Sequence, residues 1–250
     1  MRLLEAILDA NQRRAAGDRT ASVSFADHKD ALPLAALTCI DPRLNKLLPD
    51  ALGLPEEQFI WLRNAGNIIT GPLSSTMRSL ALGCAVKGAK EIAIIGHTDC
   101  QVGKTTMLDF LNRLSALGVD RHRLPENLVE YFGLFSSERQ NVIRAVEFVR
   151  GSPLIGPKIP VHGLLLDVKT GRVECVSNGY DVPPVHLPGK AGQAFAAAEQ
   201  AMAKIGAAAE ELDIPHAKIG EVVSTAEKWL HKAEHVAAAV VPSAKTPPKK

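Results

Sequence analysis

The sequence predicts an α/β fold, in which a mostly parallel β-sheet is flanked by helices and followed by a C-terminal helical extension. Up to about residue 150, short apolar segments typical of buried strands alternate with amphipathic helical segments, and that order produces a parallel sheet. From about residue 183 the chain is rich in alanine and has helical spacing of its apolar residues. We therefore expect a main domain over 1–182, a helical extension over 183–240 and a disordered tail over 241–250.

The expected elements follow from local patterns. Leucine and isoleucine recur at helical spacing near the amino terminus, and Gly17 is a plausible helix stop. Ser74 or Ser75 is expected to cap a later helix, and Lys169-Thr170-Gly171 has the composition of a hairpin turn. The expected helices are 1–16, 45–54 (a short helix or turn), 74–89, 105–118 and 128–152, and the expected strands are 32–40, 58–66, 90–100 and a hairpin over 161–177.

The composition argues against several classes of function. The 250 residues are 46% hydrophobic and 22% charged, and a net charge of +2 with 4% aromatic residues gives no basis for binding nucleic acid. The first residues are too charged for a signal peptide, and no apolar run reaches the length of about 18 residues that a membrane span needs. Four cysteines without an export signal indicate a reducing compartment, the cytoplasm, where thiols serve as metal ligands, nucleophiles or core residues.

Three potential metal ligands follow the ends of two expected strands. Cys39 stands at the carboxyl end of the strand over 32–40, within the stretch TCIDPR, and His97 and Cys100 follow the apolar part of the strand over 90–100, within GHTDC. Because the carboxyl ends of parallel strands lie at one edge of the sheet, these side chains are expected to converge. Two thiolates and one imidazole leave the fourth position of a tetrahedral zinc ion open, which is the pattern of a catalytic zinc site.

A carboxylate and a guanidinium complete the expected site. Asp41 lies two residues beyond Cys39, close enough to contact a molecule bound at the metal. Arg43 can grip the Asp41 carboxylate through two hydrogen bonds, keep it ionised and fix its orientation. An ionised Asp41 only accepts hydrogen bonds, so it favours a proton-bearing oxygen at the metal. Asp41 and Arg43 are therefore the predicted catalytic residues.

Each of these features also has a structural interpretation. An HxxC pair arises by chance, a buried cysteine is most often a core residue, and an Asp-x-Arg pair is usually a surface ion pair. Their combination at the strand ends favours the zinc site. Cys84 and Cys175 lie within an expected helix and strand and are predicted to be core residues. His28, His122 and His162 could relay protons, although surface or core roles are commoner for histidine.

Three motifs together resemble the β-class carbonic anhydrases, and their compact spacing is similar to the small microbial branch. They are Cys39-x-Asp41-x-Arg43, Arg63-Asn64-Ala65-Gly66-Asn67 and Gly96-His97-Thr98-Asp99-Cys100, and VHGLLLDVKTGRV is similar to a late hairpin of that family. The resemblance covers roughly residues 1–180. It implies zinc on Cys39, His97 and Cys100, a catalytic pair of Asp41 and Arg43, and reversible hydration of CO2 to bicarbonate. It also implies a homodimer or a multiple of dimers, with the first helix lying on the partner subunit.

The residue after the second cysteine ligand departs from the family pattern. Family members usually have glycine there, whereas this chain has Gln101, whose amide could narrow the pocket or hydrogen-bond to a ligand. The substrate is therefore open between CO2 and the carbonyl sulfide or carbon disulfide that other family members hydrolyse on the same site. A third interpretation is a zinc-binding scaffold without turnover, whose C-terminal helices dock a partner. The intact pair of Asp41 and Arg43 favours an enzyme, because a structural zinc site has no use for it.

Overall fold

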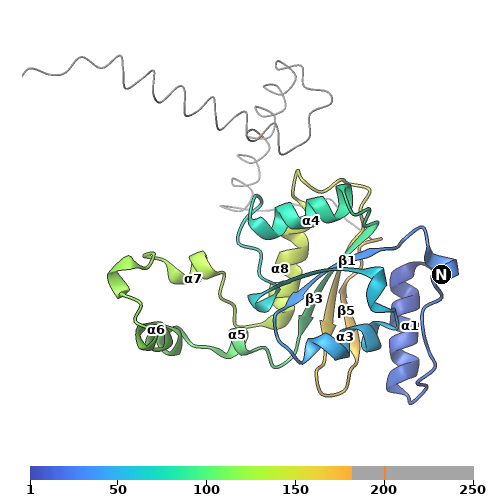
Figure 1. Cartoon of the computed structure of the whole chain (residues 1–250), viewed down its shortest axis with the longest axis horizontal. Helices are drawn as coiled ribbons and strands as arrows, with labels where there is room; N and C mark the ends of the chain where they lie inside the picture. The colour runs from blue at the N-terminus through green and yellow to red at the C-terminus, as the bar shows by residue number, and fades with distance from the viewer. Residues whose placement is uncertain (182–199, 201–250) are drawn as a thin grey trace, which may run out of the picture. The chain divides into compact units, whose positions relative to one another are not determined.

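Five strands form one sheet in the computed structural model, which describes residues 1–181 and Gln200 (Figure 1). The expected helical extension and tail lie outside the described residues, apart from Gln200. The strand order is β2-β1-β3-β4-β5, with β1 to β4 parallel and β5 antiparallel to β4, so the predicted α/β class and hairpin are confirmed. The strands are β1 (Leu34–Cys39), β2 (Phe59–Asn64), β3 (Glu91–His97), β4 (Val161–Leu166) and β5 (Val173–Ser177).

The central strands are buried on both faces, which explains their continuous apolar sequences. Every residue of β1 and β3 is buried, as expected for parallel strands that have helices on both sides. Leu34 and Ala36 of β1 belong to one core cluster, whereas Ala35 and Leu37 belong to the other, so alternate side chains face opposite layers. The first layer is completed by α1 (Leu3–Ala15) and α3 (Leu44–Leu52), and the second by α4 (Ser75–Ala85) and α8 (Glu138–Arg150).

The remaining helices of the described chain are short. They are α2 (Phe25–His28), α5 (Gln101–Lys104), α6 (Met107–Ala116), α7 (Leu128–Phe132) and the 3-10 turns η1 (Glu56–Gln58), η2 (Ala65–Asn67) and η3 (Arg121–Arg123). The helix α6 buries none of its residues, and with α7 it forms a lobe beside the sheet (Figure 1). Within residues 1–181, no helix combines the length and the apolar character that crossing a bilayer requires.

One expectation about the helices is wrong. The sequence predicts one helix over 128–152, but in the structure this helix is interrupted between α7 and α8. Gly133 adopts a left-handed conformation with φ 66°, and the Ser137 side chain starts the new helix by accepting a hydrogen bond from the backbone of Gln140. The helix α1 buries Leu3 and Ile7 and contacts α3 and β5 of its own chain, and the contact with a partner subunit that the resemblance implies for it stays a prediction.

Candidate metal centre

The carboxyl ends of β1 and β3 lie side by side where the order of the strands reverses. From β1 the chain first adds β2 on one side and then β3 on the other, so the two connections diverge between β1 and β3. Thr38 pairs with Ile95 in this register, which brings Cys39, the last residue of β1, next to the end of β3. Open α/β sheets bind ligands at such a switch point. The prediction that these two strand ends meet is therefore confirmed.

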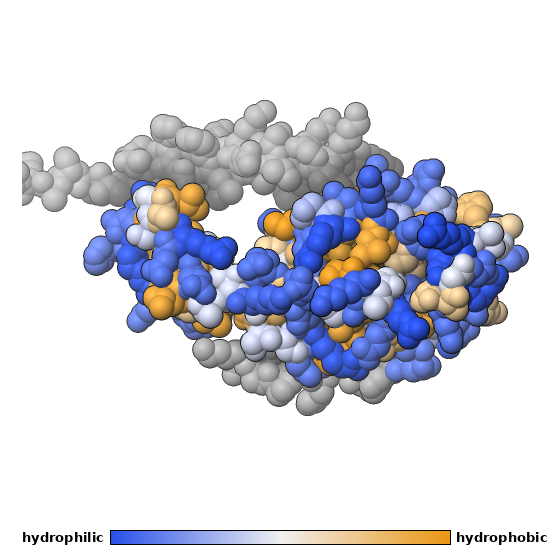
Figure 2. All heavy atoms as spheres, turned by 90° about the horizontal axis from the view of Figure 1, so that it is seen from below, coloured by the Kyte–Doolittle hydropathy of each residue, from blue (hydrophilic) through white to orange (hydrophobic). Residues whose placement is uncertain are grey.

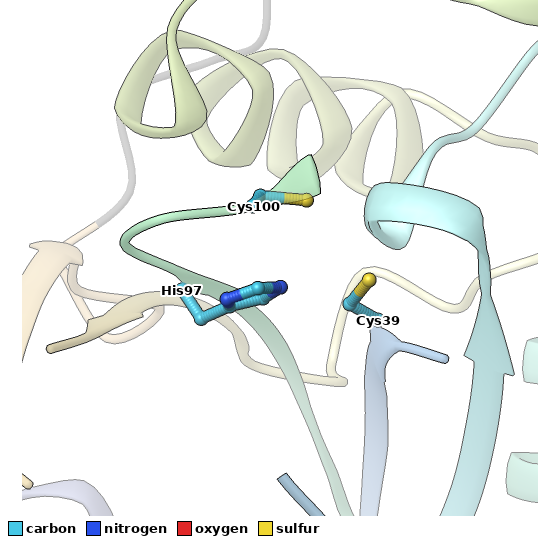
Figure 3. Close-up of side chains that lie close together, drawn as sticks. All are labelled: Cys39, His97 and Cys100. Atoms are coloured by element: carbon cyan, nitrogen blue, oxygen red, sulfur yellow. The ribbon is translucent and has the colours of Figure 1, made fainter. Parts of the chain in front are cut away.

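Cys39, His97 and Cys100 converge at this edge of the sheet. One ring nitrogen of His97 and the two sulfur atoms all lie within 4.8 Å of one another. All three residues are buried, with at most 3% of each exposed. Figure 3 shows the two sulfur atoms and the edge of the His97 ring turned toward a common space. The arrangement can hold one metal ion between residues that come from two different strands.

The His97 ring is oriented as a metal ligand would be. Its Nδ1 lies 2.9 Å from the carbonyl oxygen of Thr98, and because a carbonyl only accepts hydrogen bonds, we assign the proton to Nδ1. Nε2 then carries a lone pair, and it is buried without a hydrogen-bond partner among the described residues. A buried polar atom without a partner costs free energy. Metal-binding histidines commonly donate their second N–H to a carbonyl or carboxylate, so His97 fits such a role.

The two thiols also suit a divalent cation. A hydrogen bond from Cys100, opposed by burial and assisted by the Gly66 N–H, lowers the pKa of Cys39 to about 4. The Cys39 sulfur next to it, together with burial, raises the pKa of Cys100. The two sulfurs thus share one proton, and a zinc ion displaces such a proton when it binds both as thiolates.

The backbone of the segment RNAGN supports Cys39. The Gly66 N–H donates to the Cys39 sulfur at 3.3 Å, and the Gly66 carbonyl accepts from the Asn141 side chain at 2.8 Å. Gly66 has a φ of 68°, and a Cβ atom there would lie 2.7 Å from the ring of Phe135. Only glycine therefore fits at this position. The motif serves to aim a hydrogen-bond donor at a thiolate.

Asp41 and Arg43 form the close ion pair that the sequence predicts. Arg43 Nε lies 3.0 and 3.1 Å from the two carboxylate oxygens of Asp41, and Arg43 Nη2 lies 2.7 Å from Oδ2. These hydrogen bonds from Arg43 lower the pKa of Asp41. Only 12% of the Asp41 side chain is exposed, against 45% of the Arg43 side chain. The carboxylate is bound to Arg43 and is not one of the three converging ligands.

Asp99 is a member of this network that the sequence analysis did not single out. Arg43 Nη1 donates to the Asp99 carboxylate at 2.7 Å, and Nη2 donates to the Asp99 carbonyl at 3.0 Å. Lys104 forms a second ion pair with the same carboxylate. The hydrogen bond from Lys104, and to a smaller extent the one from Arg43, lower the pKa of Asp99 to about 2. A signal was present in the sequence, because an acidic residue stands between two ligands, but only the fold shows that it meets Arg43.

The other residues considered from the sequence take no part in the converging group. Gln101 begins α5 with an exposed side chain, and within the described residues no hydrogen bond joins its amide to a ligand. Its backbone carbonyl accepts from the Thr105 hydroxyl. Cys84 and Cys175 are half-buried, and burial raises the pKa of both thiols, which suits the predicted packing role.

A second buried cluster lies at the opposite, amino-terminal ends of the strands. Glu91, the first residue of β3, accepts from the Tyr180 hydroxyl at 2.8 Å and lies 2.9 Å from His162 Nε2. The Gly179 N–H donates to His162 Nδ1 at 2.9 Å, so the proton of the ring belongs to Nε2 and is donated to Glu91. Because these groups satisfy one another at the end of the strands away from Cys39 and His97, the structure favours a packing role for His162 over a proton relay.

Comparisons with known proteins place the chain in a family. A family model described as carbonic anhydrase matches residues 34–173, which is more than half of the chain. YtiB of Bacillus subtilis, a candidate carbonic anhydrase, is 31% identical over 190 residues, which are 72% of this chain and 100% of that protein. A crystal structure of β-carbonic anhydrase isoform I from Trichomonas vaginalis is 30% identical, covers 72% of this chain and 100% of its own, and has a TM-score of 0.56. A carbon disulfide hydrolase of Acidithiobacillus thiooxidans is 32% identical over 149 residues, which are 54% of this chain and 72% of that protein. The chain therefore belongs to the β-carbonic anhydrase family.

Proposed function

We propose that the protein catalyses the reversible hydration of CO2 to bicarbonate, with one zinc ion held by Cys39, His97 and Cys100. The observation that carries the proposal is the convergence of these buried ligands beside an Asp41 carboxylate that Arg43 holds. The Nε2 atom of His97 has no hydrogen-bond partner in the described part of the chain, which supports a metal there. Two thiolates and an imidazole match the ligand set of catalytic zinc, and family membership supports a lyase-type enzyme.

The roles of the protein groups follow from their chemistry. Zinc with one open position supplies a nucleophilic oxygen from water near neutral pH. Asp41, kept ionised by Arg43, only accepts hydrogen bonds, so it selects an oxygen that bears a proton and leaves the lone pair of that oxygen free for carbon. With zinc held there, the chemistry it would supply is addition of this water oxygen to the carbon of CO2, with one C=O electron pair moving onto oxygen. One proton of the water leaves to the solvent, so bicarbonate is the product.

The second candidate substrate class is carbon disulfide or carbonyl sulfide. The similarity to the Acidithiobacillus thiooxidans hydrolase favours it. The deciding experiment is stopped-flow CO2 hydration by the zinc-loaded full-length chain, repeated with each sulfur substrate at equal enzyme concentration. We expect turnover of CO2 to exceed that of both sulfur substrates. Faster turnover of a sulfur substrate would move the assignment to the hydrolases, and a zinc-loaded protein inactive on all three would leave the scaffold interpretation.

We also propose a cytoplasmic homodimer or a multiple of dimers. Hydrophobic residues reach the surface of the α6–α7 lobe (Figure 2). Leu108, Leu117 and Tyr131 of this lobe are 69%, 80% and 62% exposed. Exposed apolar groups gathered on one feature are typical of interaction surfaces, and a second subunit would cover them. Light scattering of the full-length chain measures the assembly. A monomer at all concentrations would refute this proposal without affecting the proposed chemistry.

We place the chemistry within residues 1–182. All five residues proposed for metal binding and catalysis, and all strands of the described sheet, precede residue 182. A chain that ends at Pro184 is expected to keep the turnover per zinc of the full-length protein. The measurement is CO2 hydration of both chains after metal analysis. A large loss of turnover at equal zinc content would show that the C-terminal part acts in the site.

A further inference from the structure

One guanidinium joins two carboxylates that come from different loops. Arg43 uses Nε and Nη2 for Asp41, and it uses Nη1 and Nη2 for the carboxylate and carbonyl of Asp99. Asp41 follows β1, whereas Asp99 lies in the turn after β3, between His97 and Cys100. Arg43 therefore cross-links the two segments that follow β1 and β3, next to the three proposed metal ligands.

The backbone conformation of Asp99 allows its two contacts with Arg43. Asp99 has a φ of 60°, a left-handed conformation that is uncommon for residues other than glycine and is tolerated best by Asn and Asp. In this conformation both its carboxylate and its carbonyl oxygen bond to Arg43. Such conformations persist where the surrounding structure holds them, and they cluster at functional sites. The turn thus places a fixed partner for Arg43 between two ligands.

We propose that Asp99 is a positioning residue, which holds Arg43 in place and thereby keeps Asp41 turned away from the metal. Only 12% of the Asp41 side chain is exposed, but 45% of the Arg43 side chain is, so an ion pair with Asp41 alone leaves the guanidinium free to move on its solvent side. The second partner, Asp99, fixes the guanidinium and so fixes where Asp41 can bind it. Without that partner, the Asp41 carboxylate is free to turn toward the open position of zinc, for which it is a suitable oxygen ligand. The inference rests on the proposed zinc site.

Lys104 supplies the matched control. It pairs with Oδ1 of Asp99, whereas Arg43 pairs with Oδ2, so each cation has its own oxygen. The two carboxylates and two cations of the network balance. In the hydrogen bonds of the described chain the Lys104 side chain contacts neither Asp41 nor a proposed metal ligand, and only its backbone N–H bonds to the Cys100 carbonyl. Removal of Lys104 should therefore leave the bonds between Arg43, Asp41 and Asp99 intact.

The test measures zinc affinity of the metal-stripped full-length chain by competition with a chromophoric chelator. Asp99→Asn keeps the size and the left-handed conformation but removes the charge, so Asp41 becomes a fourth ligand. We expect zinc to bind about tenfold more tightly and CO2 hydration to fall about tenfold, the usual scale for a residue that orients metal-site groups. In the Asp41→Ala background the same change should give no gain in affinity. Lys104→Met should stay within about twofold of wild type, since it leaves the hydrogen bonds of Arg43 to Asp41 and Asp99 in place.

The outcomes separate this inference from the proposed function. A wild-type chain that binds no zinc would remove the proposed function itself. A wild-type chain that binds zinc, with an Asp99→Asn affinity that is unchanged, lower, or altered equally with and without Asp41, would overturn the role of Asp99 alone. If Asp99→Asn does not fold, as judged by circular dichroism, Asp99→Gly replaces it, because glycine adopts a φ of about 60° freely.

Discussion

Two histidines at opposite ends of the sheet are almost equally buried, yet among the described residues only one of them has a ring nitrogen without a hydrogen-bond partner. His97 and His162 are 1% and 2% exposed. Both ring nitrogens of His162 are bonded, to Glu91 and to Gly179. Among the described residues His97 Nε2 has no hydrogen-bond partner, and two sulfur atoms lie beside it. The difference teaches that burial of an ionisable group does not by itself mark a reactive site, and that the stronger sign is a buried nitrogen without a partner beside two further potential ligands.

The second histidine, His162, belongs to the buried cluster at the amino-terminal ends of the strands, here called the amino-terminal cluster. The Tyr180 hydroxyl also accepts a hydrogen bond from the Leu4 N–H at 3.4 Å, and the Arg2 guanidinium lies 4.1 Å from the centre of the Tyr180 ring. The cluster therefore connects α1, β3, β4 and the chain after β5. We expect this end of the sheet to contribute stability and the carboxyl end to contribute chemistry.

Exchanging each histidine for alanine should give the largest contrast. His97→Ala removes a ligand, so we expect most of the bound zinc and most of the activity to be lost, as in Cys39→Ser. His162→Ala leaves the ligands intact, so each folded chain should still bind one zinc ion, while the free energy of unfolding falls. Zinc per chain after dialysis measures the first effect. Full zinc occupancy in His97→Ala would refute the ligand assignment.

Glu91→Gln should destabilise the amino-terminal cluster without touching the metal. The amide replaces one acceptor with a donor, and a lost hydrogen bond to a charged group costs about 2 kcal/mol of the free energy of unfolding. Urea denaturation at neutral pH measures this loss of unfolding free energy, with Glu174→Gln as the control. Glu174 forms an exposed ion pair with Arg139, and its loss should cost less than about 1 kcal/mol. Equal costs in the two variants would contradict the structural role of the buried cluster.

Asp41→Asn should separate chemistry from metal binding at the carboxyl end. The amide keeps the shape but is no longer a pure acceptor, so we expect CO2 hydration to fall about 10–100-fold while zinc content is kept. Stopped-flow rates per bound zinc test this. Turnover like that of the wild type would show that the pair of Asp41 and Arg43 has no catalytic role.

The smallest expected effect is the change in unfolding free energy that the amino-terminal cluster causes at alkaline pH. Burial, and then the hydrogen bond to Glu91, raise the pKa of Tyr180 above its ordinary value. Above about pH 10 the unfolded state gives up this proton and the folded state keeps it, so stability present below pH 10 declines as pH rises further. Tyr180→Phe should be less stable at neutral pH and should lack this part of the decline. Parallel curves of unfolding free energy against pH for both proteins would contradict the raised pKa.

The sequence by itself determined the candidate metal ligands and the sheet edge on which they lie. Apolar segments of strand length end at Cys39 and just before His97, and parallel strands bring such ends together whatever the details of packing. The ion pair of Asp41 and Arg43 could also be predicted, because the two residues stand only two positions apart and their hydrogen bonds are local. Caps such as Ser74 depend on neighbours within one turn and were predicted for the same reason.

Only the tertiary structure decided the contacts between distant segments. Arg43 and Asp99 are 56 positions apart, and Tyr180 and Glu91 are 89 apart, so their meeting depends on strand order and register. The break at Gly133 escaped prediction because apolar periodicity continues through it, whereas the left-handed turn depends on a single residue. The free Nε2 of His97 likewise depends on the Thr98 carbonyl that holds the other side of the ring, a geometry that residue spacing does not contain.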